Sequence, residues 1–368
     1  MLFAHLADTH LGYRQYNLDE REEDFYRSFR EAVDRIIDEG CRFVVHSGDL
    51  FDEPRPHVRA LVVVREELER LAEAGVRFYC IAGNHDLLMR RGAVPPQRLY
   101  PQVEFLTPRN PARVQDGVLI AGLPYISKLH LRVLREKLEE LGRLGERYGS
   151  SILVLHQGID RYLGVEYELR LSDLPGSFTY YALGHIHKRI LERHGRGVLA
   201  YPGSTEVWRS DEIDEYERAG KGFYIAHTDA REPEDVEWVR LAKVRRFMRL
   251  RMDSEAMEVP EIPEGAVVRL ELRCPAERFQ EAYRRVMRVL AGRALYVDVR
   301  RVPTEEEGRR RARVEGGLDE GELLGRYLEG CTEEEKAFAR ELLRVLGEGR
   351  PEDGVRLAEE FFRRWAQR

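Results

Sequence analysis

Short apolar runs alternate with amphipathic helical stretches from residue 1 to about residue 240. This alternation is typical of an α/β protein, in which strands and their covering helices follow each other along the chain. Five runs are predicted to be strands, and each leads within a few residues into a cluster of Asp, Asn or His: Leu2–Ala7, Arg42–His46, Arg77–Ala82, Ser151–Leu155 and Thr179–Leu183. Because ligand sites in α/β sheets form at the carboxyl ends of strands, the pattern predicts a polar site at that edge.

Two helices are predicted between the first three strands. The first carries an apolar stripe from Phe25 to Ile37 at the spacing of a core-facing helix. The second, over residues 58–74, already has one complete apolar face, and Val62 and Val63 lie off that face. Because these two valines are apolar, we expect part of a second face of this helix to be covered by other residues as well.

The pattern changes after residue 240. Residues 267–272 alternate as a strand, residues 279–290 carry a helical stripe, and residues 295–299 alternate again, which predicts a compact strand–helix–strand unit. Residues 303–321 are rich in charge and glycine and are typical of a solvated linker. Thr332 and Glu335 form a capping box before a final pair of helices.

Composition narrows the class of protein. With 43% hydrophobic and 34% charged residues among 368, the chain is typical of soluble globular proteins. Its four cysteines show no metal-site or disulfide spacing, and neither a signal peptide nor a membrane span is evident, so we expect a cytoplasmic protein without membrane contact. The formal net charge of −6 provides no global attraction for nucleic acid, although a local Arg patch could still provide it.

The polar clusters at the strand ends carry the candidate chemistry. A lone histidine at a strand end is more often a packed core residue than a ligand, but here five clusters recur in order. They contain Asp8 and His10, Asp49, Asn84 and His85, His156, and His185 and His187. Residues two apart in extended backbone point to the same side, so such pairs can hold one cation together.

The cluster residue types indicate a metal site with oxygen and imidazole ligands. Asp49 follows a strand, where its two carboxylate oxygens can bridge two cations, and Gly48 lets the backbone turn close to them. A ligand set of this kind without thiolate suits Mn²⁺, and Fe or Zn also accept it.

The order of these motifs resembles the calcineurin-like metallophosphoesterase superfamily. The series D-x-H, G-D, G-N-H-D, H-Q-G and G-H-I-H covers residues 1 to about 210. Within the superfamily, residues 7–12 (A-D-T-H-L-G), 48–51 (G-D-L-F) and 184–187 (G-H-I-H) resemble the SbcD-like double-strand-break repair nucleases of the meiotic-recombination-eleven family.

The resemblance implies the architecture. It implies a metallophosphoesterase β-sandwich flanked by helices, with a small α/β capping domain and a C-terminal helical segment that binds a partner. The expected boundaries are a nuclease domain over 1–240, a capping domain over 241–303, a linker over 304–321 and the C-terminal segment over 322–368.

The resemblance also implies residue roles and two Mn²⁺ ions per subunit. One ion would be held by Asp8, His10 and His187 and the other by Asn84, His156 and His185, with Asp49 as the bridge. His85 would contact the scissile phosphate and protonate the leaving oxygen. Asp86, next in the chain, either orients His85 by accepting its other ring N–H or is a simple turn aspartate. Many family members carry a histidine where this chain has Asp52.

Further contacts are expected outside the metal site. Arg55, Arg90 and Arg91 lie in loops beyond the clusters, where they could follow a DNA backbone or simply be solvated. The resemblance places a homodimer axis near Leu61, Val62 and Leu99. The final helix carries Phe361, Phe362 and Trp365, which either contact a coiled-coil ABC ATPase of the SbcC type or pack into a small helical core.

These patterns support three readings of function. The leading one is a Mn²⁺-dependent DNA nuclease, a double-strand exonuclease and single-strand endonuclease, that processes DNA ends in double-strand break repair with an ATPase partner. The alternative is a metal-dependent phosphodiesterase or phosphatase that acts on nucleotides or small phosphoesters. A tethering scaffold with a vestigial metal site is the third, and the intact ligand set disfavours it.

Overall fold

A computed structural model describes residues 1–88, 93–255, 260–290, 292–304, 307, 328–347 and 351–365. Contacts between Cα atoms divide the chain into two compact units. The first comprises Met1–Leu250, Val259–Leu270 and Met287–Val299, and the second comprises Arg251–Glu258, Glu271–Val286 and Arg300–Arg368.

The first large sheet has six strands in the order β12-β11-β1-β2-β3-β4. Their bounds are β1 (Leu2–Leu6), β2 (Phe43–His46), β3 (Arg77–Cys80), β4 (Val103–Phe105), β11 (Gly222–His227) and β12 (Val236–Arg240). Strands β1 to β4 are parallel, β11 is antiparallel to β1, and β12 is antiparallel to β11. The carboxyl ends of β1, β2 and β3 therefore lie along one edge.

The second large sheet has the order β5-β6-β7-β8-β10-β9. Its strands are β5 (Ala112–Gln115), β6 (Val118–Leu123), β7 (Ser150–His156), β8 (Tyr180–Gly184), β9 (Ile190–His194) and β10 (Gly197–Tyr201). Strands β6, β7, β8 and β10 are parallel. Like the first sheet, this one has a set of parallel strands that all end at the same edge.

The two sheets pack face to face because the side chains of each strand alternate between faces. Phe3, Phe43 and Tyr79 of the first sheet form one buried cluster with Ile152 and Tyr180 of the second. The rings of Phe3 and Tyr180 meet edge to face, with their centroids 5.0 Å apart. This cluster is the centre of a β-sandwich.

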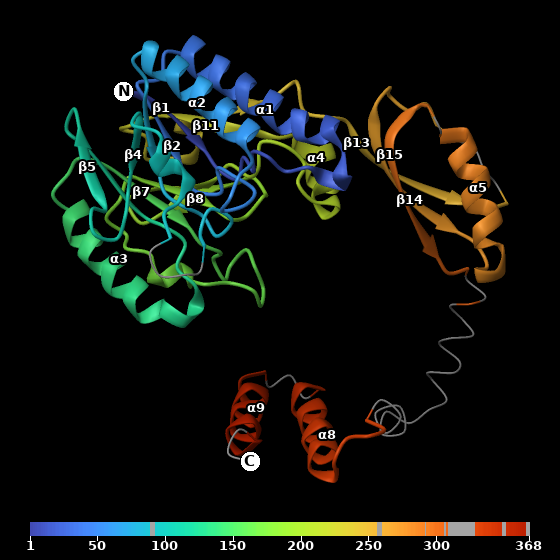
Figure 1. Cartoon of the computed structure of the whole chain (residues 1–368). Helices are drawn as coiled ribbons and strands as arrows, with labels where there is room; N and C mark the ends of the chain where they lie inside the picture. The colour runs from blue at the N-terminus through green and yellow to red at the C-terminus, as the bar shows by residue number, and fades with distance from the viewer. Residues whose placement is uncertain are drawn as a thin grey trace. The chain divides into compact units, whose positions relative to one another are not determined.

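Helices cover the outer faces of the sandwich (Figure 1). The first sheet packs on α1 (Asp19–Asp38) and α2 (Val58–Glu73), and the second on α3 (Leu131–Gly145). The predicted β-sandwich flanked by helices is confirmed. The five predicted strands and both predicted helices are also confirmed, with strand ends that differ by at most two residues.

The remaining elements are shorter or lie near the C-terminus. A three-stranded sheet has the order β13-β14-β15, and the short 3-10 helices are labelled η. The bounds are β13 (Phe247–Asp253), β14 (Ala266–Arg273), β15 (Ala294–Val302), α4 (Ile213–Ala219), α5 (Phe279–Leu290), η1 (Gln15–Asn17), η2 (Pro96–Leu99), η3 (Lys128–His130), η4 (Leu171–Asp173), η5 (Ser210–Glu212), η6 (Pro233–Asp235) and η7 (Ala276–Arg278).

The C-terminal helices α8 (Glu333–Gly347) and α9 (Pro351–Trp365) form a hairpin. The predicted capping box is present, because the Thr332 N–H donates to Glu335 at 2.7 Å and the Glu335 N–H donates to Thr332 Oγ1 at 3.3 Å. The rings of Phe338 and Phe361 stack with centroids 4.1 Å apart, whereas Phe362 and Trp365 are each 58% exposed. Phe361 thus packs within the hairpin, whereas Phe362, whose ring also lies 6.5 Å from that of Phe338, and Trp365 keep exposed surface for other contacts.

Two sequence-based expectations concern the rest of the chain. Of the predicted linker 304–321, only Thr304 and Glu307 belong to the described residues, and the domain boundaries stay a prediction. In the part of the chain that the structure describes, each helix is either too short or too polar to cross a membrane.

Candidate metal centre

The seven predicted metal ligands meet at the edge where the parallel strands of both sheets end. Asp8 and His10 follow β1, Asp49 follows β2 and Asn84 follows β3, while His156 is the last residue of β7 and His185 and His187 follow β8. Backbone hydrogen bonds join the first two loops, since the Asp8 N–H donates to Gly48 O and the His10 N–H to Asp49 O, both at 3.1 Å.

Four of these residues have left-handed backbone conformations. The φ angles are 51° for Asp8, 43° for His10, 53° for Asp49 and 89° for His185. Residues other than glycine rarely adopt positive φ, and such residues cluster at functional sites where the surrounding structure enforces them. The backbone thus turns sharply at each strand end and aims the side chain across the edge of the sandwich.

Glycines allow the loops to approach one another this closely. A Cβ atom on Gly48 would lie 2.5 Å from Nδ1 of His156, and one on Gly184 would lie 2.2 Å from the Ser47 carbonyl oxygen. On Gly83 it would lie 2.4 Å from the backbone nitrogen of Asp49. No larger residue fits at these three positions without displacing a neighbouring loop.

The first ligand group contains Asp8, His10 and His187. The Nε2 atoms of His10 and His187 lie 3.2 Å apart, and Asp8 Oδ1 lies 3.7 Å from Nε2 of His187. His10 is fully buried. Two imidazole nitrogens and a carboxylate oxygen therefore converge on one small volume.

The second ligand group is centred on the amide of Asn84. Its Oδ1 lies 3.0 Å from His156 Nε2 and 2.9 Å from His185 Nδ1. Asp49 Oδ2 connects the two groups, because it lies 3.2 Å from His156 Nε2 and 3.9 Å from His10 Nε2. The arrangement fits two cations that share one carboxylate, and the donor atoms are the nitrogen and oxygen types that Mn²⁺, Fe and Zn accept.

Hydrogen bonds behind the ligands fix the orientation of two imidazoles. Nδ1 of His156 lies 2.8 Å from the Ser47 carbonyl oxygen, and Nδ1 of His187 lies 2.9 Å from Glu212 Oε1. Both oxygens accept hydrogen bonds, so each Nδ1 carries the hydrogen and the Nε2 lone pair points into the site. Such outer contacts raise the basicity of a metal-binding imidazole.

The buried charges favour a cation at the centre of the site. Although burial alone lowers the pKa of His156, the carboxylates of Asp49 and Asp8 raise it to about 9. Burial and the nearby His156 lower the pKa of His185 to about 3. Positive charge is therefore stabilised between the two carboxylates, whether a proton or a metal ion carries it.

The structure contradicts the expected contact between Asp86 and His85. The carboxylate of Asp86 accepts hydrogen bonds from the backbone N–H groups of Gly83 at 2.9 Å and Phe51 at 3.1 Å, so it braces the two loops instead. Nδ1 of His85 lies 2.7 Å from the backbone carbonyl oxygen of Asp52. The residue that orients His85 is Asp52, through its main chain.

A cavity of about 610 Å³ opens over the ligands. Its lining includes Asn84, His85, His185, His187 and Trp208, together with the cationic side chains of Lys128, Lys188 and Arg209 and the acidic side chains of Glu166, Glu168, Asp211 and Glu212. Solvent and a phosphate-bearing ligand can thus reach the metal ligands from one side.

Sequence reasoning missed Trp208 and Glu212, which contact the ligands. Both follow β10, which is parallel to β8, so the segment leaves the sheet at the same edge as the other clusters. The rule that sites form at the carboxyl ends of strands could have identified this segment.

The residues expected to contact DNA or a second subunit differ in how exposed they are. Arg55 is exposed in the loop before α2, and Arg90 and Arg91 lie outside the described residues. Leu61 and Val62 are partly buried on α2, whereas Leu99 is 65% exposed on η2.

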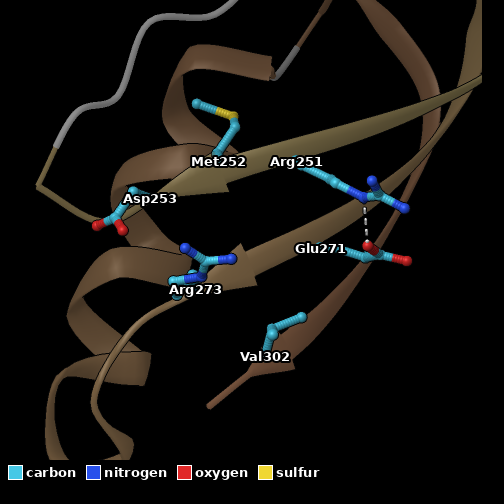
Figure 2. A pocket seen from close by; sticks show the side chains of 6 residues that line it. All are labelled: Arg251, Met252, Asp253, Glu271, Arg273 and Val302. Carbon is cyan, nitrogen blue, oxygen red and sulfur yellow. Dashed lines mark hydrogen bonds and ion pairs between the residues drawn. The ribbon is translucent and has the colours of Figure 1, made fainter. Parts of the chain in front are cut away.

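A second cavity of about 300 Å³ lies in the second unit (Figure 2). It is lined by Arg251, Met252, Asp253, Glu271, Arg273 and Val302. Within it, Arg251 of β13 pairs with Glu271 of the neighbouring strand β14 at 3.0 Å. Among the described residues, this lining contains no imidazole and none of the predicted site residues.

Comparison with known proteins identifies the family. The family model described as calcineurin-like phosphoesterase matches residues 1–189. DNA double-strand break repair protein Mre11 of Methanocaldococcus jannaschii is 44% identical over 227 residues, 61% of this chain and 62% of that protein. The Mre11 protein of Thermoplasma acidophilum is 34% identical over 262 residues, 68% of each chain.

A longer alignment includes the C-terminal part. The Mre11 protein of Methanopyrus kandleri is 29% identical in an alignment 368 residues long, and this alignment covers 94% of this chain and 79% of that protein. The chain thus spans 62% of the length of each of the first two relatives and between 50% and 79% of the length of the others. From the matched model, these relatives and the ligand order at the strand ends, we conclude that the chain belongs to the calcineurin-like phosphoesterases and, within them, to the Mre11 family.

Proposed function

We propose that this protein is a Mn²⁺-dependent DNA nuclease, with double-strand exonuclease and single-strand endonuclease activity, that processes DNA ends in double-strand break repair. The observation that carries the proposal is the convergence of seven nitrogen and oxygen donors, in two groups joined by Asp49, beneath an open cavity. The relatives named as DNA double-strand break repair proteins support DNA as the substrate.

The proposed roles of the ligands follow their grouping. Asp8, His10 and His187 would hold one Mn²⁺, Asn84, His156 and His185 the other, and Asp49 both. When bound, such cations would polarise a phosphodiester and lower the pKa of water enough to supply hydroxide as the nucleophile near neutral pH.

His85 is suited to protonate the leaving oxygen. Its Nδ1 donates to the Asp52 carbonyl oxygen at 2.7 Å, which fixes the ring, and its side chain lines the cavity. Nε2 can therefore carry a second proton toward the substrate. General acid catalysis of this kind accelerates a reaction by about 10² to 10⁴-fold.

Cations around the cavity would hold the flanking phosphates. Lys128, Lys188 and Arg209 line it, and the exposed Arg55 follows the Asp49 loop. Neutralising phosphates with such side chains supplies sequence-independent affinity for DNA.

Partners and location are part of the same proposal. We propose a homodimer through α2 and η2, and a coiled-coil ABC ATPase of the SbcC type that binds the exposed aromatic residues of α9. A DNA-processing enzyme of this kind would act in the cytoplasm.

The test is hydrolysis of linear double-stranded DNA and circular single-stranded DNA by the purified chain with Mn²⁺. The wild type should degrade both, and His85→Gln should reduce the rate by about 100-fold or more while Mn²⁺ still binds. His227→Gln is the matched control, because His227 is exposed and pairs with Leu2 at the opposite edge of the sheet from the metal centre.

Small phosphoesters separate the two candidate activities. A wild type that hydrolyses bis-p-nitrophenyl phosphate or cyclic nucleotides but leaves both DNA substrates intact would contradict the nuclease proposal. That result would favour a phosphodiesterase or phosphatase that acts on small substrates.

A further inference from the structure

The side chains of Asp52 and Trp208 meet beside His10, and neither residue is one of the predicted metal ligands. We propose that they are positioning residues that hold the imidazole of His10 in the tautomer and orientation that bind metal. This inference rests on the proposed two-metal function, and it concerns residues that bind neither the metal nor the substrate.

The carboxylate of Asp52 contacts both partners through one oxygen. The indole N–H of Trp208 donates to Asp52 Oδ1 at 2.9 Å. The same oxygen lies 3.2 Å from Nδ1 of His10, although the direction of this contact falls short of a full hydrogen bond. The Asp52 side chain is 20% exposed and that of His10 is fully buried, so little solvent screens the contact.

A carboxylate at this position selects the useful tautomer of His10. Negative charge beside Nδ1 stabilises hydrogen on that atom and leaves the lone pair on Nε2. Nε2 is the atom that faces Nε2 of His187 at 3.2 Å. A neutral side chain at position 52 would keep the space filled but would lose this bias.

The ring of Trp208 restricts rotation of the imidazole. It stacks on His10 with centroids 4.7 Å apart and an interplanar angle of 17°. Edge-to-face contacts also join it to the rings of His85 and His187, at centroid distances of 5.2 and 5.0 Å. A turn of the His10 ring about its bond to Cβ would break the stack.

Trp208 is itself held on both sides. Its carbonyl oxygen accepts a hydrogen bond from Gln15 Nε2 at 2.7 Å, and Gln15 is buried. The next residue, Arg209, places its guanidinium 5.3 Å from the centre of the indole ring, within range of a cation–π contact. The indole can therefore act as a fixed wall for His10.

A direct ligand role for Asp52 conflicts with its contacts. His10, Asp52 and His85 do offer three ligand atoms that lie within 4.8 Å of one another. However, Nδ1 of His85 donates to the Asp52 carbonyl oxygen at 2.7 Å, so that atom has no free lone pair. Asp52 Oδ1 already accepts the indole N–H. The trio is better explained as a support for the metal centre than as a third metal site.

The test compares Mn²⁺ binding by calorimetry in the full chain and three variants: Asp52→Asn, Trp208→Phe and the double variant. Asp52→Asn keeps the shape and removes the charge, while Trp208→Phe keeps a ring and removes the N–H. Asp229→Asn and Trp238→Phe are the matched controls, because Asp229 is exposed and Trp238 packs on Tyr224 in the edge strand β12.

Asp52→Asn should weaken Mn²⁺ binding by about 10- to 100-fold, the usual effect of losing an outer partner of a metal-binding histidine. Trp208→Phe should weaken Mn²⁺ binding less than Asp52→Asn. The decrease in Mn²⁺ affinity of the double variant should be smaller than the product of the two single decreases, because both changes act on one contact. Saturating Mn²⁺ should restore hydrolysis of bis-p-nitrophenyl phosphate with an unchanged KM. The unfolding temperature in EDTA should match that of the control variants.

Three outcomes would overturn the inference. Unchanged Mn²⁺ affinity in Asp52→Asn would remove the positioning role. Loss of a whole equivalent of bound Mn²⁺ would make Asp52 a ligand, and activity that excess Mn²⁺ fails to restore would make it a catalytic residue. If Asp52→Asn unfolds in EDTA, Trp208→Phe provides the test instead, and an unchanged Mn²⁺ affinity of Trp208→Phe would overturn the inference. A wild type that neither binds Mn²⁺ nor cleaves any phosphoester would contradict the proposed function itself.

Discussion

At the scale of single residues, the metal centre depends on backbone conformations that most side chains avoid. Asp8, His10, Asp49 and His185 have positive φ, which costs on the order of 1 kcal/mol or more at each position. Hydrogen bonds between the loops offset this cost, among them the bond from the Asp8 N–H to Gly48 O at 3.1 Å. A substitution that separates the loops should therefore disturb ligands on both sheets.

Gly48→Ala tests this dependence. Gly48 has a φ of +94°, and an added Cβ would lie 2.5 Å from His156 Nδ1 and 2.9 Å from Gly83 Cα. We expect loss of Mn²⁺ binding and a decrease in the free energy of unfolding that exceeds the roughly 1–2 kcal/mol of a left-handed alanine alone. Urea denaturation in EDTA and calorimetric titration with Mn²⁺ measure the two effects.

Gly40→Ala is the control for backbone strain. Gly40 has a φ of +69°, and its added Cβ would meet no atom within 4 Å. This variant should lose about 1–2 kcal/mol of stability and keep wild-type Mn²⁺ affinity. Equal losses in the two variants would mean that the close approach at Gly48 is unimportant.

At the scale of elements, a buried ion network joins α1 to the segment that carries Trp208. Arg21 contacts Asp24 within α1 at 2.5 Å and Glu206 at 3.4 Å, and it donates to the Val207 carbonyl oxygen at 3.0 Å. All three charged side chains are fully buried, and Arg245 also pairs with Asp24. Burial raises the pKa of Glu206, which shows how strongly this carboxylate depends on its cationic partner.

Arg21→Leu should destabilise the protein by about 3–5 kcal/mol, because it leaves the buried carboxylate of Glu206 without its cationic partner, whereas Asp24 keeps Arg27 and Arg245. Trp208 fluorescence should also change, since the Arg21 contact to Val207 lies one residue before it. Chemical denaturation in EDTA and the emission spectrum report the two effects.

Arg35→Leu is the matched change on the exposed face of the same helix. Arg35 pairs with Glu39 at 3.0 Å, with side chains 48% and 38% exposed. Exposed pairs contribute about 0–1 kcal/mol, so this variant should remain close to the wild type. A similar cost for both arginines would argue against the buried network.

At the scale of the whole molecule, one prediction concerns self-association. Leu99 is 65% exposed, and the adjacent Tyr100 donates to the Leu61 carbonyl oxygen of α2 at 3.0 Å, which holds η2 beside α2. Leu99 and the partly exposed Leu61 and Val62 of α2 could together form the kind of contiguous apolar patch that is typical of interfaces. Leu99→Asp should convert a dimer to a monomer in sedimentation at micromolar concentration.

Val165→Asp is the control for the dimer prediction. Val165 is 87% exposed on a different loop, so the variant adds the same charge without touching α2 or η2. Its sedimentation should match the wild type. A wild type that is already monomeric would remove the dimer from the proposed function.

A second whole-molecule prediction concerns the ATPase partner. Phe362 is 58% exposed on α9, while Phe361 stacks on Phe338 inside the hairpin. Phe362→Ala should weaken binding to the coiled coil by about 2 kcal/mol, roughly 30-fold, and leave helicity unchanged, because aromatic anchors dominate such interfaces. Calorimetry measures the affinity for the coiled coil, and circular dichroism measures the helicity.

Phe361→Ala separates packing from recognition in the same helix. Removing a stacked ring should reduce the stability of the α8–α9 hairpin, with partner binding lost only as a consequence of unfolding. If Phe362→Ala instead binds the coiled coil like the wild type, the aromatic face of α9 is not the contact surface.

The sequence by itself determined the elements and the ligand candidates of this protein. Alternating and helical periodicities are local, so they located β1, β2, β3, β7 and β8 to within two residues. The clusters that follow these strands also identified the donors that meet at one edge, because parallel strands end together. Both inferences depend on residues close to one another in the chain.

The tertiary structure alone decided which side chains support these donors. Asp86 braces two loops rather than His85, and Asp52 contacts Trp208, 156 residues away. Contacts across such separations depend on how the two sheets face each other and on a loop approach that only glycine allows at Gly48. Local patterns carry no information about this packing, since the same periodicity is compatible with several arrangements of the strands.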